Sequence, residues 1–235
     1  MDGFAENLLT ASFHGSILIL AVLVIRLVLW KTPKKYICLL WLLAGIRLLL
    51  PIEIRSDLSL QPRFALPGLP EGSWRVWGMC LWAVIAGGFG IYSLISYCRL
   101  KNRVREAVRI RGGWESDRID TAFILGFVKP KILIPMGMSN QSRRYILAHE
   151  RTHLDKGDHW IKMIGFLALA LHWFNPLVWV AYICLCKDIE MACDERVVRF
   201  MEVEERKSYS AALLSCSSRQ FHFAASPVAF GEVNV

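Results

Sequence analysis

The stretch SNQSRRYILAHERTHL, residues 139–154, decides the fold because it places the pentapeptide HERTH on a predicted helix. The stretch opens with a serine and an asparagine, either of which can cap a helix, and Gly157 is a suitable stop. Positions four apart share one face of a helix, so His149 and His153 can direct imidazole nitrogens at one zinc ion. Glu150 lies near the edge of that face, where its carboxylate can act as the general base of a zinc peptidase.

A catalytic zinc ion takes three protein ligands and keeps one position open for water, so a third ligand must lie elsewhere. His159 stands where the longer motif HExxHxxGxxH has its last histidine, but Lys156 occupies the glycine position. Glu190 and Asp194 are four apart on a second predicted helix. We therefore favour Glu190 as the third metal ligand, and Asp194 as an outer acceptor for the second N–H of a ligating histidine.

The composition indicates a membrane protein. Hydrophobic residues make up 54% of the 235 residues, above the 45–50% that is usual for soluble domains. The net charge of +8 comes from basic residues that border apolar runs, which follows the positive-inside rule and predicts no direct nucleic-acid contact. The seven cysteines form no CxxC pair, so neither a disulfide framework nor a cysteine zinc site is expected.

Three apolar runs, at residues 8–30, 36–51 and 76–98, predict three transmembrane helices, the second of marginal length. Residues 52–75 hold three prolines and read as an irregular loop. Basic clusters follow the first and third runs, whereas the amino terminus is acidic. These charges predict a multi-pass cell-membrane protein with its amino terminus outside and its catalytic site in the cytoplasm.

Short elements are expected between the third span and the zinc helix. Residues 100–111 are predicted to extend the third span as a helix, which Gly112-Gly113 ends. Two short strands are then predicted at residues 121–125 and 131–135, around Gly126 and Pro130.

The apolar stretch 161–186 could cross a bilayer once as a helix of about 39 Å. A single crossing would separate His153 from Glu190 by the membrane thickness, so we predict a helical hairpin at residues 160–189 instead. Asn175-Pro176 is the expected break, since proline disfavours helix at the residue before it.

Several segments besides HERTH form one pattern. They are Gly126-Phe127-Val128-Lys129-Pro130-Lys131-Ile132-Leu133-Ile134-Pro135, Asp158, His172-Trp173-Phe174-Asn175-Pro176-Leu177-Val178-Trp179, Glu190 to Glu195, and Tyr209-Ser210-Ala211. In these segments the chain resembles the membrane metallopeptidases of the BlaR/MecR antirepressor type. The resemblance implies a site-specific zinc protease that transmits an outside signal, which in the best-known members is β-lactam binding to an extracellular sensor. The sequence ends at Val235 without such a sensor, so protease chemistry is the better supported part.

We therefore predict a mostly α fold, in which polytopic membrane helices carry a small α+β gluzincin-like zinc protease unit. Residues 1–98 form the predicted membrane domain, and residues 99–235 the cytoplasmic-facing zinc metalloprotease domain. A peptide substrate is expected to pair with the edge of the second strand, along Ile132, Leu133 and Ile134.

The predicted function is that of an integral membrane zinc metalloendopeptidase acting on a cytoplasmic regulator such as a transcriptional repressor, or on itself. Zn²⁺ is the only cofactor implied, and the expected partners are a protein substrate, membrane lipid and a second copy of the chain. One alternative is a quality-control or prenyl-processing membrane zinc protease, against which the segment Trp173 to Trp179 argues. Another is a non-catalytic zinc-containing signalling scaffold, which would not need Glu150.

Overall fold

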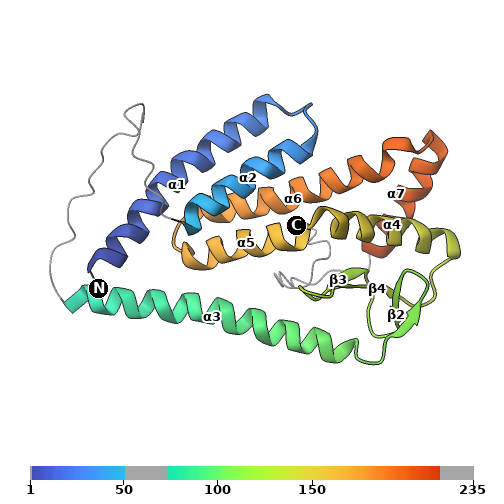
Figure 1. Ribbon diagram of the computed structural model, residues 1–235, viewed down its shortest axis with the longest axis horizontal. Helices are drawn as coiled ribbons and strands as arrows, with labels where there is room; N and C mark the ends of the chain where they lie inside the picture. The colour runs from blue at the N-terminus through green and yellow to red at the C-terminus, as the bar shows by residue number, and fades with distance from the viewer. Residues whose placement is uncertain (1, 51–72, 218–235) are drawn as a thin grey trace.

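The computed structural model describes residues 2–50 and 73–217, and it is mostly helical with one small mixed sheet (Figure 1). The helices are α1 (Asp2–Val28), α2 (Lys34–Leu49), α3 (Ser73–Arg103), α4 (Asn140–Lys156), α5 (Asp158–Leu171), α6 (Pro176–Val197) and α7 (Val203–Ser217), with a 3-10 turn at Val198–Phe200. The strands are β1 (Val108–Ile110), β2 (Gly113–Ser116), β3 (Phe123–Leu125) and β4 (Lys131–Pro135). The mostly α fold class is confirmed, and most of the predicted loop at 52–75 lies outside the described residues.

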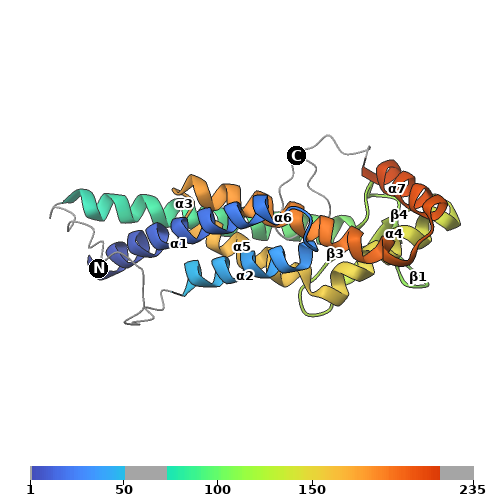
Figure 2. The same ribbon diagram turned by 90° about the horizontal axis from the view of Figure 1, so that it is seen from above.

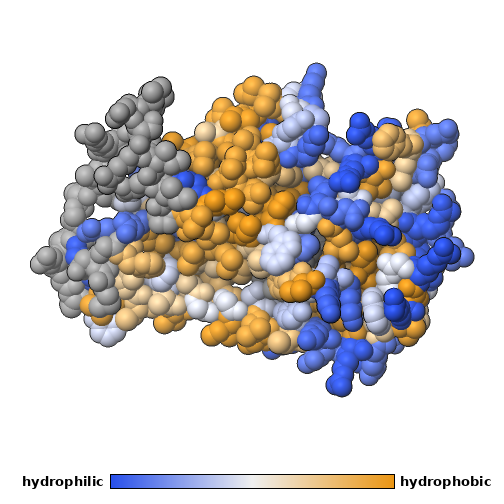
Figure 3. Space-filling model, in the orientation of Figure 1, coloured by the Kyte–Doolittle hydropathy of each residue, from blue (hydrophilic) through white to orange (hydrophobic). Residues whose placement is uncertain are grey.

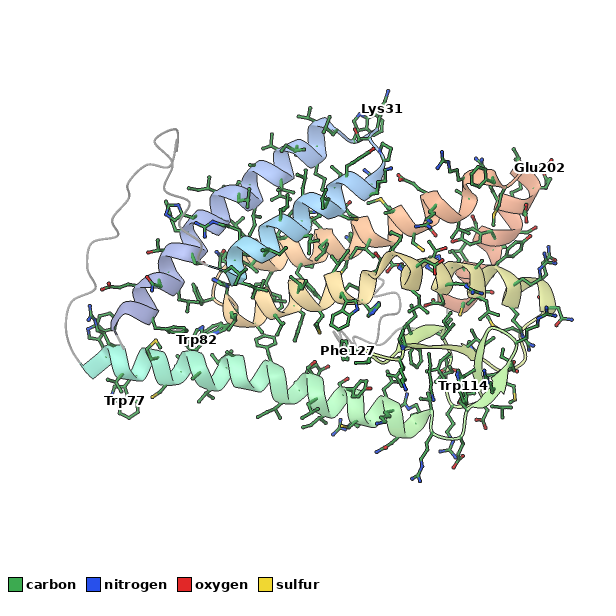
Figure 4. The ribbon with its side chains drawn as sticks, in the orientation of Figure 1. Lys31, Trp77, Trp82, Trp114, Phe127 and Glu202 are labelled. Carbon is green, nitrogen blue, oxygen red and sulfur yellow. The ribbon has the colours of Figure 1, made fainter. Side chains whose placement is uncertain are left out.

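Four helices, α1, α2, α5 and α6, lie side by side as a bundle, while α3 runs along its flank (Figures 1 and 2). The sheet, α4 and α7 are gathered at one end of this bundle. Trp82 of α3 donates its indole N–H to the Leu171 carbonyl of α5 at 2.8 Å, which ties the flanking helix to the bundle (Figure 4).

The bundle has one apolar core to which all four helices contribute. Its buried members include Ile19 of α1, Trp41 of α2 and Ile189 of α6. Helices α5 and α6 approach closely at Gly165 of α5, where an added Cβ atom would lie 2.7 Å from the Leu185 side chain of α6. The predicted membrane and protease domains, 1–98 and 99–235, therefore share this core.

Two of the described helices are long and apolar enough to span a membrane: Phe4–Val28 within α1 and Trp74–Arg103 within α3. The second predicted span is α2, whose 16 residues fall short of the roughly 20 that a crossing helix needs. Hydrophobic residues cover the bundle side of the surface, and hydrophilic residues cover the end that holds the sheet and α7 (Figure 3).

The apolar stretch after α4 folds back on itself at Asn175-Pro176, the break indicated by the sequence. Asn175 caps α6 by accepting from the Leu177 N–H at 3.0 Å, and Pro176 begins the helix. The Asn175 amide also donates to the hydroxyls of Ser12 and Ser16 in α1, at 2.8 and 2.7 Å. The polar tip of the hairpin thus finds its hydrogen-bond partners on a neighbouring helix.

The carboxy-terminal half of α6 is fixed to α1 and α2 by a buried charge. Asp188 is fully buried, and its carboxylate accepts from the Arg26 guanidinium at 2.8 and 3.1 Å and from the Trp41 indole at 2.8 Å. Seven residues further along α6, about two helical turns on, Glu195 accepts from the backbone N–H of Lys34 at 2.9 Å. One face of α6 is therefore attached to the two amino-terminal helices.

The sheet has the strand order β1-β2-β4-β3, and two predictions about it are wrong. The helix predicted at residues 100–111 ends at Arg103, and Val108–Ile110 pairs with β2 as a strand. The basic and apolar residues of this segment alternate, which is the period of a strand, and Gly112 adopts the positive φ of 96° that the turn requires.

The second wrong prediction concerns the substrate strand. Strand β4 pairs with β2 in parallel on one side and with β3 in antiparallel fashion on the other, so it is internal. Its Ile132, Leu133 and Ile134 side chains are buried at 7%, 2% and 0% exposure. A substrate peptide cannot pair with the edge of β4, because this strand has no free edge. On the side of the sheet away from β1, the edge strand is β3.

Candidate metal centre

Helix α4 carries the HERTH residues with the caps that the sequence predicts. The Ser139 hydroxyl accepts from the Ser142 N–H at 3.0 Å, and the helix ends at Gly157, which has a φ of 69°. His149 and His153 lie one turn apart on the buried face, and their Nε2 atoms are 3.1 Å apart. The helix thus presents two imidazole nitrogens to one point.

Helix α6 brings Glu190 to the same point. Its Oε2 atom lies 3.2 Å from Nε2 of His153 and 3.6 Å from Nε2 of His149. Ligand atoms bound tetrahedrally to zinc at 2.0–2.1 Å are about 3.3 Å apart. The three atoms therefore have the separations that a single zinc-sized ion requires.

Partners on the outer nitrogens fix the tautomer of both histidines. Nδ1 of His153 lies 2.7 Å from the Asp158 carboxylate, so it carries the proton and donates it. Nδ1 of His149 lies 2.8 Å from the Tyr209 hydroxyl, which in turn donates to Asp194 at 2.7 Å. With protons on both Nδ1 atoms, the two Nε2 atoms present lone pairs to each other and to a carboxylate oxygen. A set of acceptors without a donor between them is suited to a cation.

The electrostatics of the site favour positive charge between these ligands. Burial by itself lowers the pKa of His149, but contacts with Asp194, Cys193 and Glu190 outweigh burial and raise this pKa overall, so a cation at Nε2, whether a proton or a metal ion, is favoured. Burial opposes the charged form of Glu190, yet the Lys162 ammonium and the two imidazoles hold its pKa well below the usual range. Glu190 is therefore an ionised carboxylate, the form that binds a metal.

Glu150 lies beside the ligands in a small cavity. Its side chain is 6% exposed, and its Oε2 atom has no hydrogen-bond partner among the described residues. Burial raises the pKa of this carboxyl group, which suits a general base that works near neutral pH. The cavity measures about 20 Å³, enough for one water molecule. It is lined by Thr121, Ala122, Ile146, His149, Glu150, Leu213 and Cys216.

Comparison with known proteins places this arrangement in a family. Residues 73–234, which include every residue of the site, match the family described as BlaR1 peptidase M56. The chain belongs to this family. Membership in a peptidase family of this type agrees with the metal-compatible group that α4 and α6 assemble.

Relatives of this M56 chain match it over about half of its length. The methicillin resistance mecR1 protein of Staphylococcus aureus is 27% identical over 106 residues, which cover 43% of this chain and 18% of the relative. The regulatory protein BlaR1 of Bacillus licheniformis is 26% identical over 131 residues, which cover 54% of this chain and 21% of the relative. The matched segment thus spans about one fifth of the length of each relative.

A cysteine that the sequence analysis set aside also lies at the M56 site. Among the described residues, His149, His153 and Cys193 form a group whose potential ligand atoms lie within 4.8 Å of one another. The Cys193 sulfur is 3.7 Å from Nδ1 of His149 and donates to the backbone carbonyl of that residue at 3.4 Å. It thus approaches the ring from the side opposite Nε2, so Glu190 fits an ion between the Nε2 atoms better.

His159, the other ligand candidate, does not join the group found among the described residues. Its ring packs near Trp160, with a centroid distance of 5.5 Å.

Three site residues had no role assigned from the sequence: Asp158, Lys162 and Tyr209. Asp158 and Tyr209 were part of the resemblance, but their contacts with the histidines depend on how α4, α5 and α7 pack. Lys162 gave a clearer signal, because it is a lone cation in the otherwise apolar stretch that becomes α5. Buried lysines are rare unless they are paired, so its position called for an acidic partner.

Proposed function

We propose that this M56 chain is an integral membrane zinc metalloendopeptidase that cleaves a cytoplasmic regulatory protein. One observation carries the proposal: two imidazole nitrogens and a carboxylate oxygen converge at 3.1 to 3.6 Å, and beside them lies the buried Glu150 carboxylate, whose Oε2 atom has no partner in the part of the chain that the structure describes. Structural zinc sites are closed by four protein ligands and need no neighbouring base. The presence of Glu150 in a water-sized cavity therefore favours catalysis over a scaffold role.

The chain's residues divide the chemistry as follows. His149, His153 and Glu190 would hold the zinc ion, which when bound supplies a Lewis acid for the substrate carbonyl and for water. Oε2 of Glu150 takes a proton from the attacking water as the new C–O bond forms. The same oxygen then returns the proton to the amine nitrogen as the C–N bond of the peptide breaks. Asp158 and Tyr209 hold the two imidazoles in the tautomer that leaves Nε2 free.

The outer edge of β3, which pairs with no further strand among the described residues, is the surface that would receive the substrate backbone. Thr121 and Ala122, directly before this strand, line the cavity that contains Glu150. An extended peptide that pairs with Phe123–Leu125 would thus run past the base. This assignment replaces the internal strand β4.

The relatives support a role in signalling. They are named as a methicillin resistance protein and a regulatory protein, which suggests that this chain cleaves a regulator, such as a transcriptional repressor, in response to a signal. The basic residues after α1 and in the last turn of α3 support a cytoplasmic site with the amino terminus outside.

The test uses the full chain, purified in detergent micelles, with zinc content and proteolysis measured in parallel. Wild type should bind one zinc ion per chain and cleave itself or fluorescent casein. Glu150→Gln should retain the zinc ion and lose cleavage, because only the base is removed. Glu190→Ala should lose zinc, whereas His159→Ala, the matched control, should keep it. Wild-type cleavage by Glu150→Gln, or normal zinc content in Glu190→Ala, would contradict the proposal.

A further inference from the structure

The second oxygen of Glu190 is engaged by a buried lysine. Lys162 is 8% exposed, and its ammonium lies 2.7 Å from Oε1 of Glu190. The other oxygen, Oε2, faces the two Nε2 atoms. The carboxylate is thus divided, with one oxygen turned to α5 and the other to the two histidines of α4.

The placement of this ion pair is informative because a buried pair is a poor way to stabilise a fold. Removing two charges from water costs several kcal/mol, and apolar residues of similar volume are often as stable or better. A lysine here instead serves the group that it contacts, and that group is the carboxylate at the metal-compatible point.

The chemistry of the lysine head group determines what the contact does. A carboxylate can bind a metal through one oxygen or through both. The ammonium is a compact point charge, so it can hold Oε1 alone and leave Oε2 unoccupied. A carboxylate restricted in this way fills a single coordination position, which preserves the open position that a catalytic zinc ion needs.

We propose that Lys162 is a positioning residue that restricts Glu190 to one-oxygen binding of the metal ion. This inference rests on the proposed zinc peptidase function, and it assigns a role to a side chain that does not itself touch the metal or the substrate. Lys162 acts only through Glu190, by occupying Oε1.

Arginine separates this role from that of an ordinary ion pair. Its guanidinium keeps the positive charge, so it would satisfy a purely structural requirement. However, its planar fork pairs with both oxygens of a carboxylate, so it would draw Oε2 away from the metal. Lys162→Arg should therefore weaken zinc binding even though the charge is retained.

The experiment measures zinc affinity by competition with a chromogenic chelator and records the visible absorption of the Co²⁺-substituted full chain in micelles. Loss of an outer partner of a metal ligand typically costs 10–100-fold in affinity, and we expect this loss for both Lys162→Met and Lys162→Arg. The Co²⁺ band should weaken in Lys162→Met, because the released carboxylate can bind through both oxygens and raise the coordination number. Lys187→Met, an exposed lysine on the helix of Glu190, is the matched control and should match wild type.

The outcomes are distinguishable. Wild-type zinc affinity in either Lys162 variant, or an unchanged Co²⁺ spectrum in Lys162→Met, would overturn the proposal. Circular dichroism identifies a variant that fails to fold, and Lys162→Arg then decides alone, since it keeps the charge. If wild type binds no zinc, the proposed function fails first. If wild type binds zinc and cleaves protein while the Lys162 variants match it, only the positioning role is lost.

Discussion

Asp188 offers a direct test of how the amino-terminal helices are joined to the helix of the metal ligand. Its carboxylate is fully buried and accepts three hydrogen bonds, two from Arg26 and one from Trp41. Removing one partner of a buried ion pair typically costs about 3–5 kcal/mol, because the other charge is left uncompensated. The Arg26 side chain is 25% exposed and can regain some solvation when its partner is removed. We therefore expect Asp188→Ala to lower the free energy of unfolding by about 3 kcal/mol, the lower end of this range.

The assay is reversible unfolding of the purified chain in mixed micelles of increasing SDS content, followed by circular dichroism. Asp188→Ala, Arg26→Met and the double variant form a cycle. The double variant should recover about 1–3 kcal/mol relative to the sum of the single changes, since it leaves no unpaired charge. Glu204→Ala removes the exposed partner of Lys207 and should change the unfolding free energy by less than about 0.5 kcal/mol. A cost below about 1 kcal/mol for Asp188→Ala, or strict additivity in the cycle, would refute this reasoning.

Further predictions concern the site and its orientation. Tyr209→Phe removes the hydroxyl that receives the proton of Nδ1 of His149, so zinc affinity measured by chelator competition should fall about 10–100-fold. Cys193→Ala should still bind one zinc ion per chain in metal analysis, because Cys193 is not one of the proposed ligands. Loss of the zinc ion in this variant would instead identify Cys193 as a metal ligand. Single cysteines at Lys156 and Lys187, in a background cleared of native cysteines, should both react with an impermeant thiol reagent only from the cytoplasmic side. Labelling of either position from outside would contradict the proposed topology.

Local sequence signals predicted the parts of the fold whose cause is local. The serine and glycine caps of α4 act within one helical turn, so both ends of this helix could be recognised from the sequence. The break at Asn175-Pro176 was recognisable for the same reason, because proline restricts its immediate neighbour. The strand Lys131–Pro135 followed from its short apolar run, in which Ile132 and Ile134 are β-branched, between turn signals.

Features that depend on distant contacts could not be predicted from the sequence. Whether β4 is an edge or an internal strand depends on its pairing with β2, whose residues pair with residues 19 positions later in the sequence. The role of Tyr209 depends on the packing of α7 against α4, across 60 residues of sequence. The spacing of Glu190 and Asp194 indicated one ligand and one outer partner, but did not reveal that a hydroxyl mediates the shorter contact with His149.

The shared core of the bundle means that the peptidase half cannot be inherited separately from the membrane half. A fragment that began at residue 99 would uncover the face of α6 that α2 now covers, and would leave the Asp188 charge without a counterion. Gene fusion or domain shuffling at this boundary would therefore yield an insoluble product. Substitutions that alter the packing of α1 or α2 against α6 would disturb the helix that carries Glu190, so these two amino-terminal helices are part of the scaffold of the metal ligands.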